Sequence, residues 1–394
     1  MIYSKITLKH GKDEFVKRFH PWIFSGAIHL KNKNLKAGDI VEVFDANNNY
    51  LATGFFQEGS ISIRIFTYEK QEIDTSFWKQ KIERAFELRK ALGLVDNKEN
   101  NSYRLTYAES DGLPGLIADF YNGTLVLQCN VLGMYLQKEH LAKAFREVLG
   151  DRLNAIYDKS ADTLLNQERF VTENSLLWGT PQNETIIENN CSYFVDWVEG
   201  QKTGFFLDQK DSRKLLQKFT ANKSVLNTFA YSGGFSVNAI QGGASEVLSV
   251  DSSKLAIELC NKNVALNFPD YSKHSVQLAD VKNYLQSETA LWDVIILDPP
   301  AFAKHQSQSM QAMKGYRFLN RLALERLKPN AILFTFSCSQ AVSKESFQTA
   351  ILSAAIDAGR NVKILYRLTQ APDHPVNIFF PESEYLKGLV IFVE

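Results

Sequence analysis

The chain has 394 residues with 44 basic and 44 acidic side chains, so its formal net charge is zero. This balance excludes a global electrostatic attraction to nucleic acid, and any nucleic-acid surface must be a local patch. The length predicts two or three domains. The four cysteines are widely spaced without a CxxC pair, which disfavours a disulfide framework and a metal site and indicates a reducing compartment. Without an apolar run of signal-peptide or membrane-spanning length, we expect a soluble cytoplasmic protein with no membrane partner.

Residues 1–70 are predicted to form a small β module. Apolar residues alternate in "DIVEVFD" and "SIRIF", and "ANNN" between these runs has residues that tolerate a left-handed backbone. The aromatic-rich "HPWIFSGAI", residues 20–28, is expected to interrupt the strands as a turn. It is either a contact surface or a plug that fills a small barrel.

Residues 71–188 are predicted to form an α+β unit. The stretch "DTSFWKQKIERAFELRKALGL" has helical spacing of apolar residues, with Asp74 or Thr75 as the N-cap. Two strand-like runs joined by Asp-Gly and Pro-Gly turns follow, then an amphipathic helix and a further strand. Glu109 and Asp111 are either functional acids or turn residues, and the neighbouring glycines and proline favour the turn.

Residues 189–394 alternate between apolar strands and helices, which predicts a parallel sheet covered on both faces, an α/β architecture of the Rossmann-like type. Ligands of such sheets bind beyond the carboxyl ends of the strands. The first strand ends in "NTFAYSGGFSV", whose spacing does not match the dinucleotide motif G-x-G-x-x-G. The next two end at Asp251 and Asp280, which suit the ribose hydroxyls and the adenine amine of a nucleoside or, equally, helix N-caps.

The fourth strand ends in "DPPAFAK", residues 298–304, where two prolines fix a rigid loop and leave carbonyl oxygens available to a ligand. The fifth ends in "FSCS", which is expected to bring Cys338 beside the Asp298 loop. The alternative is that Cys338 is a buried thiol closing a strand. Cys129, Cys191 and Cys260 are interpreted as structural.

Together these segments resemble class I S-adenosylmethionine (SAM)-dependent methyltransferases, and more specifically the bacterial PUA-domain family of 23S ribosomal RNA cytosine carbon-5 methyltransferases. The resemblance covers the whole chain: "HPWIFSGAI" with "GDIVEVFD" is similar to the PUA module, and "ESDGLPGLIADFY" to the central unit. "TGFFLDQKDSR", "LNTFAYSGGFSV", "DPPAFAK", "FSCS" and "DHPV" are similar to the catalytic motifs. The family implies a seven-stranded sheet, parallel except for one strand, and an RNA-binding PUA-like domain at residues 1–70.

The resemblance also implies a role for each motif residue. The cofactor is SAM, and its methionine part would be lined by the turn after the first strand, its ribose held by Asp251 and its adenine by Asp280. Asp298 would face both the cofactor amine and the target base. The residues implied to contact the cofactor are Asp208, Gln209, Arg213, Phe229, Tyr231, Ser232, Gly233, Asp251, Asp280 and Asp298. Lys210 departs from the arginine that often follows "DQ" in the family, and loses that residue's fork geometry.

The implied reaction needs a cysteine, because carbon-5 of cytosine becomes nucleophilic only after a thiolate attacks carbon-6. Cys338 is the expected nucleophile, and Asp298 is expected to stabilise the protonated ring nitrogen. "DPPAFAK" lacks the second cysteine that related RNA enzymes have in this loop, so the base that removes the carbon-5 proton stays unassigned. The partner would be ribosomal RNA with the target base unstacked, and a homodimer is left open.

Two other functions remain. The Asp-Pro-Pro-aromatic loop resembles the one that amino-methyltransferases use to polarise an exocyclic amine, which needs no thiol. A non-catalytic RNA-binding protein with a relic cofactor fold is the other, although the presence of both Asp251 and Asp280 disfavours it.

Overall fold

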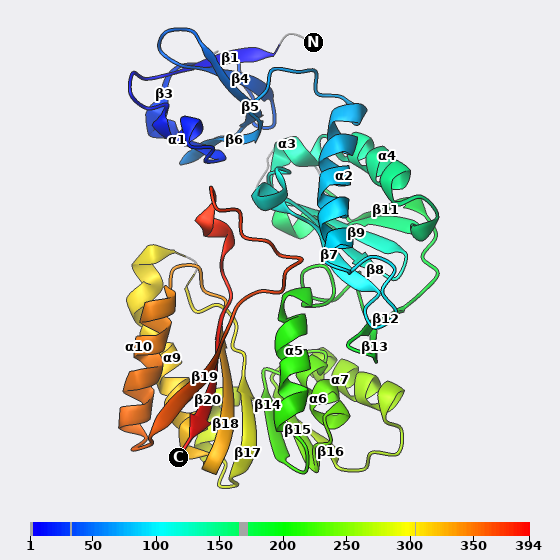
Figure 1. Cartoon of the computed structure of the whole chain (residues 1–394), viewed down its shortest axis with the longest axis vertical. Helices are drawn as coiled ribbons and strands as arrows, with labels where there is room; N and C mark the ends of the chain where they lie inside the picture. Colours follow the sequence, from blue (N-terminus) through cyan, green and yellow to red (C-terminus); the bar gives the residue numbers. More distant parts are fainter. Residues whose placement is uncertain (1–2, 32–33, 165–171, 304) are drawn as a thin grey trace. The chain divides into compact units, whose positions relative to one another are not determined.

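The computed structural model describes residues 3–31, 34–164, 172–303 and 305–394 and divides into two compact units (Figure 1). Unit 1 comprises Met1–Ile186, Val195–Phe205 and Pro372–Ser383. Unit 2 comprises Ile187–Phe194, Phe206–Ala371 and Glu384–Glu394. Within the described ranges, no helix has the length and apolar character needed to cross a membrane.

The N-terminal part of unit 1 is a six-stranded sheet in the order β2-β6-β5-β4-β1-β3. Its alternating apolar residues form a closed core that includes Ile6, Val41, Val43 and Ile63, all fully buried. The expectation that residues 20–28 form only a turn is wrong, because Trp22–Phe24 pair with β6 as a short strand and Ile28 starts another. The elements are β1 (Ser4–Leu8), α1 (Glu14–Lys17), β2 (Trp22–Phe24), β3 (Ile28–Lys31), β4 (Ile40–Phe44), β5 (Tyr50–Phe56) and β6 (Ile61–Thr67).

The second part of unit 1 is a five-stranded sheet, β11-β10-β9-β8-β7, packed against helices. The predicted helix is confirmed: Asp74 is its N-cap and accepts a hydrogen bond from the Phe77 amide at 2.8 Å. The elements are α2 (Thr75–Ala91), β7 (Ser102–Tyr107), β8 (Leu116–Tyr121), β9 (Thr124–Cys129), α3 (Leu132–Tyr135), α4 (Lys138–Leu149), β10 (Ala155–Asp158) and β11 (Ser175–Gly179). A two-stranded sheet follows, β12 (Thr185–Glu188) with β13 (Cys191–Phe194).

Glu109 and Asp111 have structural partners in unit 1. Asp111 accepts two hydrogen bonds from the buried Arg89 guanidinium, at 2.7 and 2.9 Å, and one from the Tyr107 amide at 2.6 Å. Glu109 pairs with Arg64 and accepts from the Trp22 indole at 2.8 Å. These contacts support the interpretation that the two acids hold the turn.

Unit 2 is a seven-stranded sheet in the order β16-β15-β14-β17-β18-β20-β19, in which β20 alone runs antiparallel to its neighbours. The predicted class I methyltransferase topology is therefore confirmed. Helices α5, α6 and α7 form one contiguous group (Figure 1), and α8, α9 and α10 form another. The strands are β14 (Ser224–Thr228), β15 (Glu246–Asp251), β16 (His274–Leu278), β17 (Trp292–Leu297), β18 (Leu327–Ser337), β19 (Val362–Leu368) and β20 (Lys387–Val393), and the helices are α5 (Lys210–Leu216), α6 (Gly234–Gln241), α7 (Lys254–Asn267), α8 (Val281–Ser287), α9 (Ser309–Glu325) and α10 (Lys344–Asp357).

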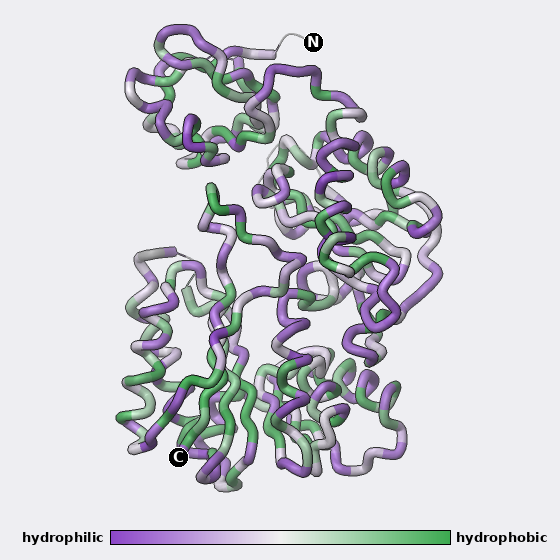
Figure 2. The backbone as a smooth tube through the Cα atoms, viewed as in Figure 1, coloured by the Kyte–Doolittle hydropathy of each residue, from purple (hydrophilic) through white to green (hydrophobic). Residues whose placement is uncertain are grey.

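The central strands of this sheet are apolar on both faces, as a doubly covered parallel sheet requires. Figure 2 shows the middle of the sheet largely in the hydrophobic colour. On one face Leu226, Ile295 and Leu333 are fully buried in a core shared with α8, α9 and α10. On the other, Phe336 packs against Phe235 of α6 with ring centroids 5.6 Å apart. Polar residues that follow these strands are therefore held at one rigid edge.

Candidate active site at the carboxyl edge of the sheet

The turn after β14 has an unusual backbone. Phe229, Tyr231 and Gly233 all have positive φ angles, of 56°, 45° and 77°. A side chain at Gly233 would also place its Cβ 2.6 Å from the Cys260 sulfur, so both backbone and packing require glycine here. Positive φ at bulky residues is uncommon and concentrates at ligand-binding sites. The structure thus has a tightly shaped turn where the sequence predicted close approach to a cofactor.

Asp251 and Asp280 lie at the next two strand ends, as predicted. Asp251 accepts from the Tyr231 amide at 2.9 Å and the Ser253 amide at 2.9 Å, so it fixes the turn after β14. Asp280 is exposed and caps α8 by accepting from the Asn283 amide at 2.9 Å. Each carboxylate oxygen has two lone pairs. The N-cap alternative therefore holds for Asp280 but is wrong for Asp251, because the N-cap of α7 is Ser253. Both carboxylates keep acceptor capacity for a ligand.

Asp208, Gln209 and Asp298 form an acceptor-rich cluster. The Gln209 amide nitrogen donates to Asp298 Oδ2 at 3.1 Å, and the Tyr385 hydroxyl donates to Asp208 Oδ2. Asp208 Oδ1 and Gln209 Oε1 are buried and have no hydrogen-bond partner among the described residues. Burial and the nearby Asp208 charge raise the pKa of Asp298 to about 7. The cluster therefore combines negative charge with unsatisfied acceptors, a combination that favours a cationic donor.

Arg213 is buried against Glu188. Its guanidinium donates to both carboxylate oxygens, at 2.6 and 2.7 Å, and to the Phe206 carbonyl at 2.8 Å. These bonds fasten the "FFLDQ" segment to β12. The structure thus places Arg213 behind the acceptor cluster as a support of that segment. Its neighbours in the sequence did not indicate Glu188 as its partner.

Cys338 follows β18 directly and lies beside the Asp298 loop. Its sulfur is 4.0 Å from the Pro299 carbonyl oxygen. The neighbouring Ser339 hydroxyl accepts from the Phe302 amide at 3.0 Å and contacts the Tyr316 hydroxyl at 2.8 Å, which ties the loop to the cysteine segment. Cys338 is partly exposed, whereas Cys129, Cys191 and Cys260 are buried.

The surroundings of Cys338 disfavour its thiolate form. Burial and the charges of Asp298 and Asp208 raise the pKa of its thiol to about 12. Attack by this sulfur therefore requires an additional influence that stabilises the anion.

Two nearby residues were not identified from the sequence. Tyr385 contacts Asp208, and Lys387 at the start of β20 donates from its ammonium nitrogen to the Ser339 carbonyl at 2.7 Å. Lys387 is 6% exposed, and burial lowers its pKa to about 8. The sequence signal for Lys387 was a lysine at the start of the apolar run "KGLVIFV".

Two arginines between the Asp298 loop and Cys338 have internal partners. Arg317 pairs with Asp357 at 2.6 Å and Arg321 with Glu325 at 2.5 Å, both on the helical part of the segment. Lys304 lies outside the described residues. The described residues contain no group of three or more His, Cys, Asp or Glu side chains that could hold a metal ion.

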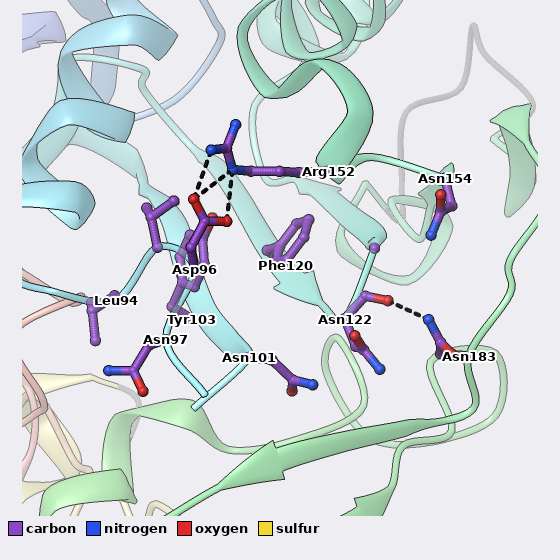
Figure 3. Close-up of a pocket in the computed structure, with 12 residues that line it drawn as sticks. Leu94, Asp96, Asn97, Asn101, Tyr103, Phe120, Asn122, Arg152, Asn154 and Asn183 are labelled. Atoms are coloured by element: carbon purple, nitrogen blue, oxygen red, sulfur yellow. Dashed lines mark hydrogen bonds and ion pairs between the residues drawn. The ribbon is translucent and has the colours of Figure 1, made fainter. Parts of the chain in front are cut away.

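A separate polar cavity of about 220 Å³ lies in unit 1 (Figure 3). Asp96 and Arg152 form an ion pair at 2.7 Å on its wall, and the Asn183 amide donates to the Asn122 carbonyl at 2.9 Å. Its lining contains none of the site residues predicted from the sequence.

Comparisons with known proteins identify relatives over nearly the whole chain. A family model described as S-adenosylmethionine-dependent methyltransferase matches residues 110–381, and a PUA-like domain model matches residues 6–68. Ribosomal RNA large subunit methyltransferase I of Tolumonas auensis is 39% identical over 98% of this chain and 99% of its own length. The protein of the same name from Escherichia coli O157:H7 is 38% identical, with 98% of each chain covered.

Solved structures resemble the whole chain as well. A Streptococcus mutans protein described provisionally as a SAM-dependent methyltransferase matches with a TM-score of 0.83, 25% identity and full coverage of both chains. A second structure, provisionally described as a methyltransferase complexed with SAH, matches with a TM-score of 0.84, 25% identity and the same coverage.

The acceptor cluster fits such a cofactor. SAM carries an α-ammonium group with three N–H donors and a sulfonium charge. Asp208 Oδ1 and Gln209 Oε1 are unsatisfied buried acceptors, and Asp298 lies next to them. A bound cation would both satisfy these atoms and offset the carboxylate repulsion.

Proposed function

Because the chain belongs to the S-adenosylmethionine-dependent methyltransferase family, we propose that it methylates carbon-5 of a cytosine in large-subunit ribosomal RNA. In this proposal Cys338 is the covalent nucleophile and Asp298 is the acid that acts on the base. One observation carries it: a partly exposed thiol and an acidic group whose pKa lies near neutrality occupy adjacent strand ends, joined through Ser339.

The names of the relatives support the RNA substrate. We propose that residues 1–70 bind RNA as a PUA-like domain, that residues 71–188 form a central domain, and that residues 189–394 carry the reaction. A base within a duplex cannot present carbon-6 to a thiol, so the target is single-stranded or flipped out of its helix.

The cofactor would be held by the residues at the strand ends. The turn of Phe229, Tyr231, Ser232 and Gly233 would contact its methionine part, Asp251 its ribose and Asp280 its adenine. Asp208 and Gln209 have the free acceptors for its ammonium group. When bound, SAM supplies a methyl group on a positively charged sulfur.

The proposed role of Asp298 follows from its acidity. With a pKa of about 7, a substantial fraction of its carboxyl is protonated at neutral pH. The acid would donate its proton to N3 of cytosine, which draws electrons from the ring and makes carbon-6 electrophilic. An ordinary exposed aspartate, ionised above about pH 4, lacks this capacity.

The proposed role of Cys338 is to open and then restore the ring. Its thiol proton leaves to water, a bond forms between sulfur and carbon-6, and the electron pair of the C5–C6 double bond becomes available at carbon-5. After carbon-5 is methylated, a base removes its proton, and the C5–H electrons re-form the double bond as the thiolate departs. N3 then returns its proton to Asp298.

The test is to map methylated cytosines in large-subunit rRNA from cells lacking this protein and from cells complemented with the wild type or Cys338→Ala. We expect one 5-methylcytidine to disappear in the deletion strain, to return with the wild type and to remain absent with Cys338→Ala. Normal methylation by Cys338→Ala would refute the proposed nucleophile.

A second candidate is methylation of an exocyclic amine, which the Asp-Pro-Pro-aromatic loop and the high pKa of Cys338 favour. Chromatographic and mass analysis of the nucleosides separates the two reactions. The second candidate predicts a nucleoside methylated on nitrogen and no dependence on the thiol.

A further inference from the structure

Lys387 is a buried cation placed alongside Cys338. In the antiparallel pairing of β18 and β20, Lys387 lies opposite Ser337, the residue before the cysteine. Its ammonium nitrogen reaches the carbonyl of Ser339, the residue after it, at 2.7 Å. Because cross-strand partners share a face of the sheet, the Lys387 side chain leaves β20 on the face of Ser337, and its ammonium group ends at the backbone that follows Cys338.

Such a burial is unfavourable for a lysine. An ammonium group in an apolar environment has a high desolvation free energy, and one neutral carbonyl offsets little of it. The charged side chains that act on it are the Cys338 thiolate and Glu384, which favour its positive charge, and Lys344, which is paired with Glu384 and disfavours it. A positive charge at this position thus interacts favourably with an anion on the sulfur.

A backbone hydrogen bond at Cys338 favours the thiolate, but burial and the charges of Asp298 and Asp208 oppose it more strongly. Lys387 acts in the opposite direction, because its positive charge favours the thiolate.

We propose that Lys387 is a positioning residue that holds its ammonium group beside Cys338 and stabilises the thiolate during attack. Lys387 neither gains nor loses a proton in this role, because the thiol proton leaves to water. The catalytic meaning of the inference rests on the proposed function, but the coupling between lysine and thiol is measurable without RNA.

The experiment measures the rate at which iodoacetamide alkylates Cys338 in the RNA-free protein, followed by mass spectrometry of the peptide that contains Cys338. Below the thiol pKa this rate is proportional to the thiolate fraction. At pH 7, where Lys387 is largely charged, we expect Lys387→Met to lower the rate about tenfold, which corresponds to a rise of about one unit in the thiol pKa. Lys387→Arg, which keeps the charge, should stay within about threefold of the wild type.

Lys328→Met is the matched control. Lys328 lies near the opposite end of β18, about 30 Å from Cys338 along the strand, and pairs with Asp293 at 2.8 Å. We expect this variant to alkylate at the wild-type rate. An unchanged rate in Lys387→Met, or an equal loss in Lys387→Arg, would overturn the inference and leave Lys387 as a support for the Ser339 loop.

A measurement on the wild type tests the coupling even if the variants misfold. Lys387 loses its charge above a pH of about 8. The logarithm of the alkylation rate should therefore rise with pH at a slope of one below pH 8 and more slowly just above it, whereas a constant slope contradicts the coupling. If Cys338→Ala still methylates RNA while these alkylation results hold, the proposed function fails and the coupling stands.

Discussion

The Gln209 side-chain amide donates to Asp298 at 3.1 Å and thereby joins the "FFLDQ" segment to the Asp-Pro-Pro loop. This bond favours the ionised form of Asp298, whereas burial and Asp208 favour the neutral form. The balance leaves the pKa of Asp298 at about 7, so that its carboxyl can donate a proton at neutral pH. Substitutions at either residue should therefore shift both stability and reaction.

Asp298→Asn should stabilise the protein at pH 8 and abolish methylation. The folded-state pKa of Asp298, about 7, lies above its unfolded value near 4, so the wild type loses stability as pH rises through this interval. Asparagine removes that loss of stability, which is on the order of 2 kcal/mol after allowance for the partial exposure of Asp298. Thermal denaturation at pH 4 and pH 8 checks this, and equal gains at both pH values would contradict it.

A cytosine analogue with fluorine at carbon-5 should trap the enzyme on RNA. Fluorine cannot leave as the proton does, so the bond between sulfur and carbon-6 persists after methyl transfer. Denaturing gels should show a covalent complex with the wild type and with Cys129→Ala, whose buried thiol belongs to unit 1, and none with Cys338→Ala. A complex formed by Cys338→Ala would place the nucleophile elsewhere.

Gly233→Ala should weaken SAM binding and lower the melting temperature. The added methyl group meets a φ of 77° and a contact of 2.6 Å with the Cys260 sulfur, so both the turn and α7 must shift. Gly243→Ala is the control, because its φ is 86° but its nearest neighbour is 3.6 Å away. Calorimetric titration with SAM should show at least a tenfold loss for Gly233→Ala and little change for Gly243→Ala. Equal affinities of the two variants for SAM would show that this turn does not belong to the cofactor site.

Arg89→Met should destabilise unit 1 far more than Arg152→Met. The Arg89 and Asp111 side chains are 0% and 5% exposed, so removing the arginine leaves a buried carboxylate unpaired, at about 3–5 kcal/mol. The Arg152 and Asp96 side chains are 45% and 63% exposed, where an ion pair contributes less than about 1 kcal/mol. Chemical denaturation of both variants measures the difference, and similar losses would contradict this account of burial.

The sequence predicted what depends on local pattern and on the order of strands. Apolar runs located the strands of unit 2, and the rule that ligands bind at their carboxyl ends brought Asp251, Asp280, Asp298 and Cys338 to one edge. The Asp74 cap was visible because capping is decided within four residues.

The missed features depend on contacts between distant segments. Glu188, the partner of Arg213, is 25 residues away, and nothing in "FFLDQKDSR" indicates it. Lys387 reaches the Ser339 carbonyl, next to Cys338, only because β20 is inserted beside β18, which is a property of the sheet order. Residues 20–28 were predicted as a turn because a three-residue strand is too short to show alternation.

The position of β20 in the sheet also has a consequence for biosynthesis. Of the seven strands of this sheet, β20 comes last in the sequence, yet it lies between β18 and β19, which precede it. A nascent chain that ends before residue 384 lacks both Tyr385 and Lys387 and leaves two strand edges unpaired. Cys338 would thus acquire the nearby charge of Lys387 only after residues 384–394 have left the ribosome.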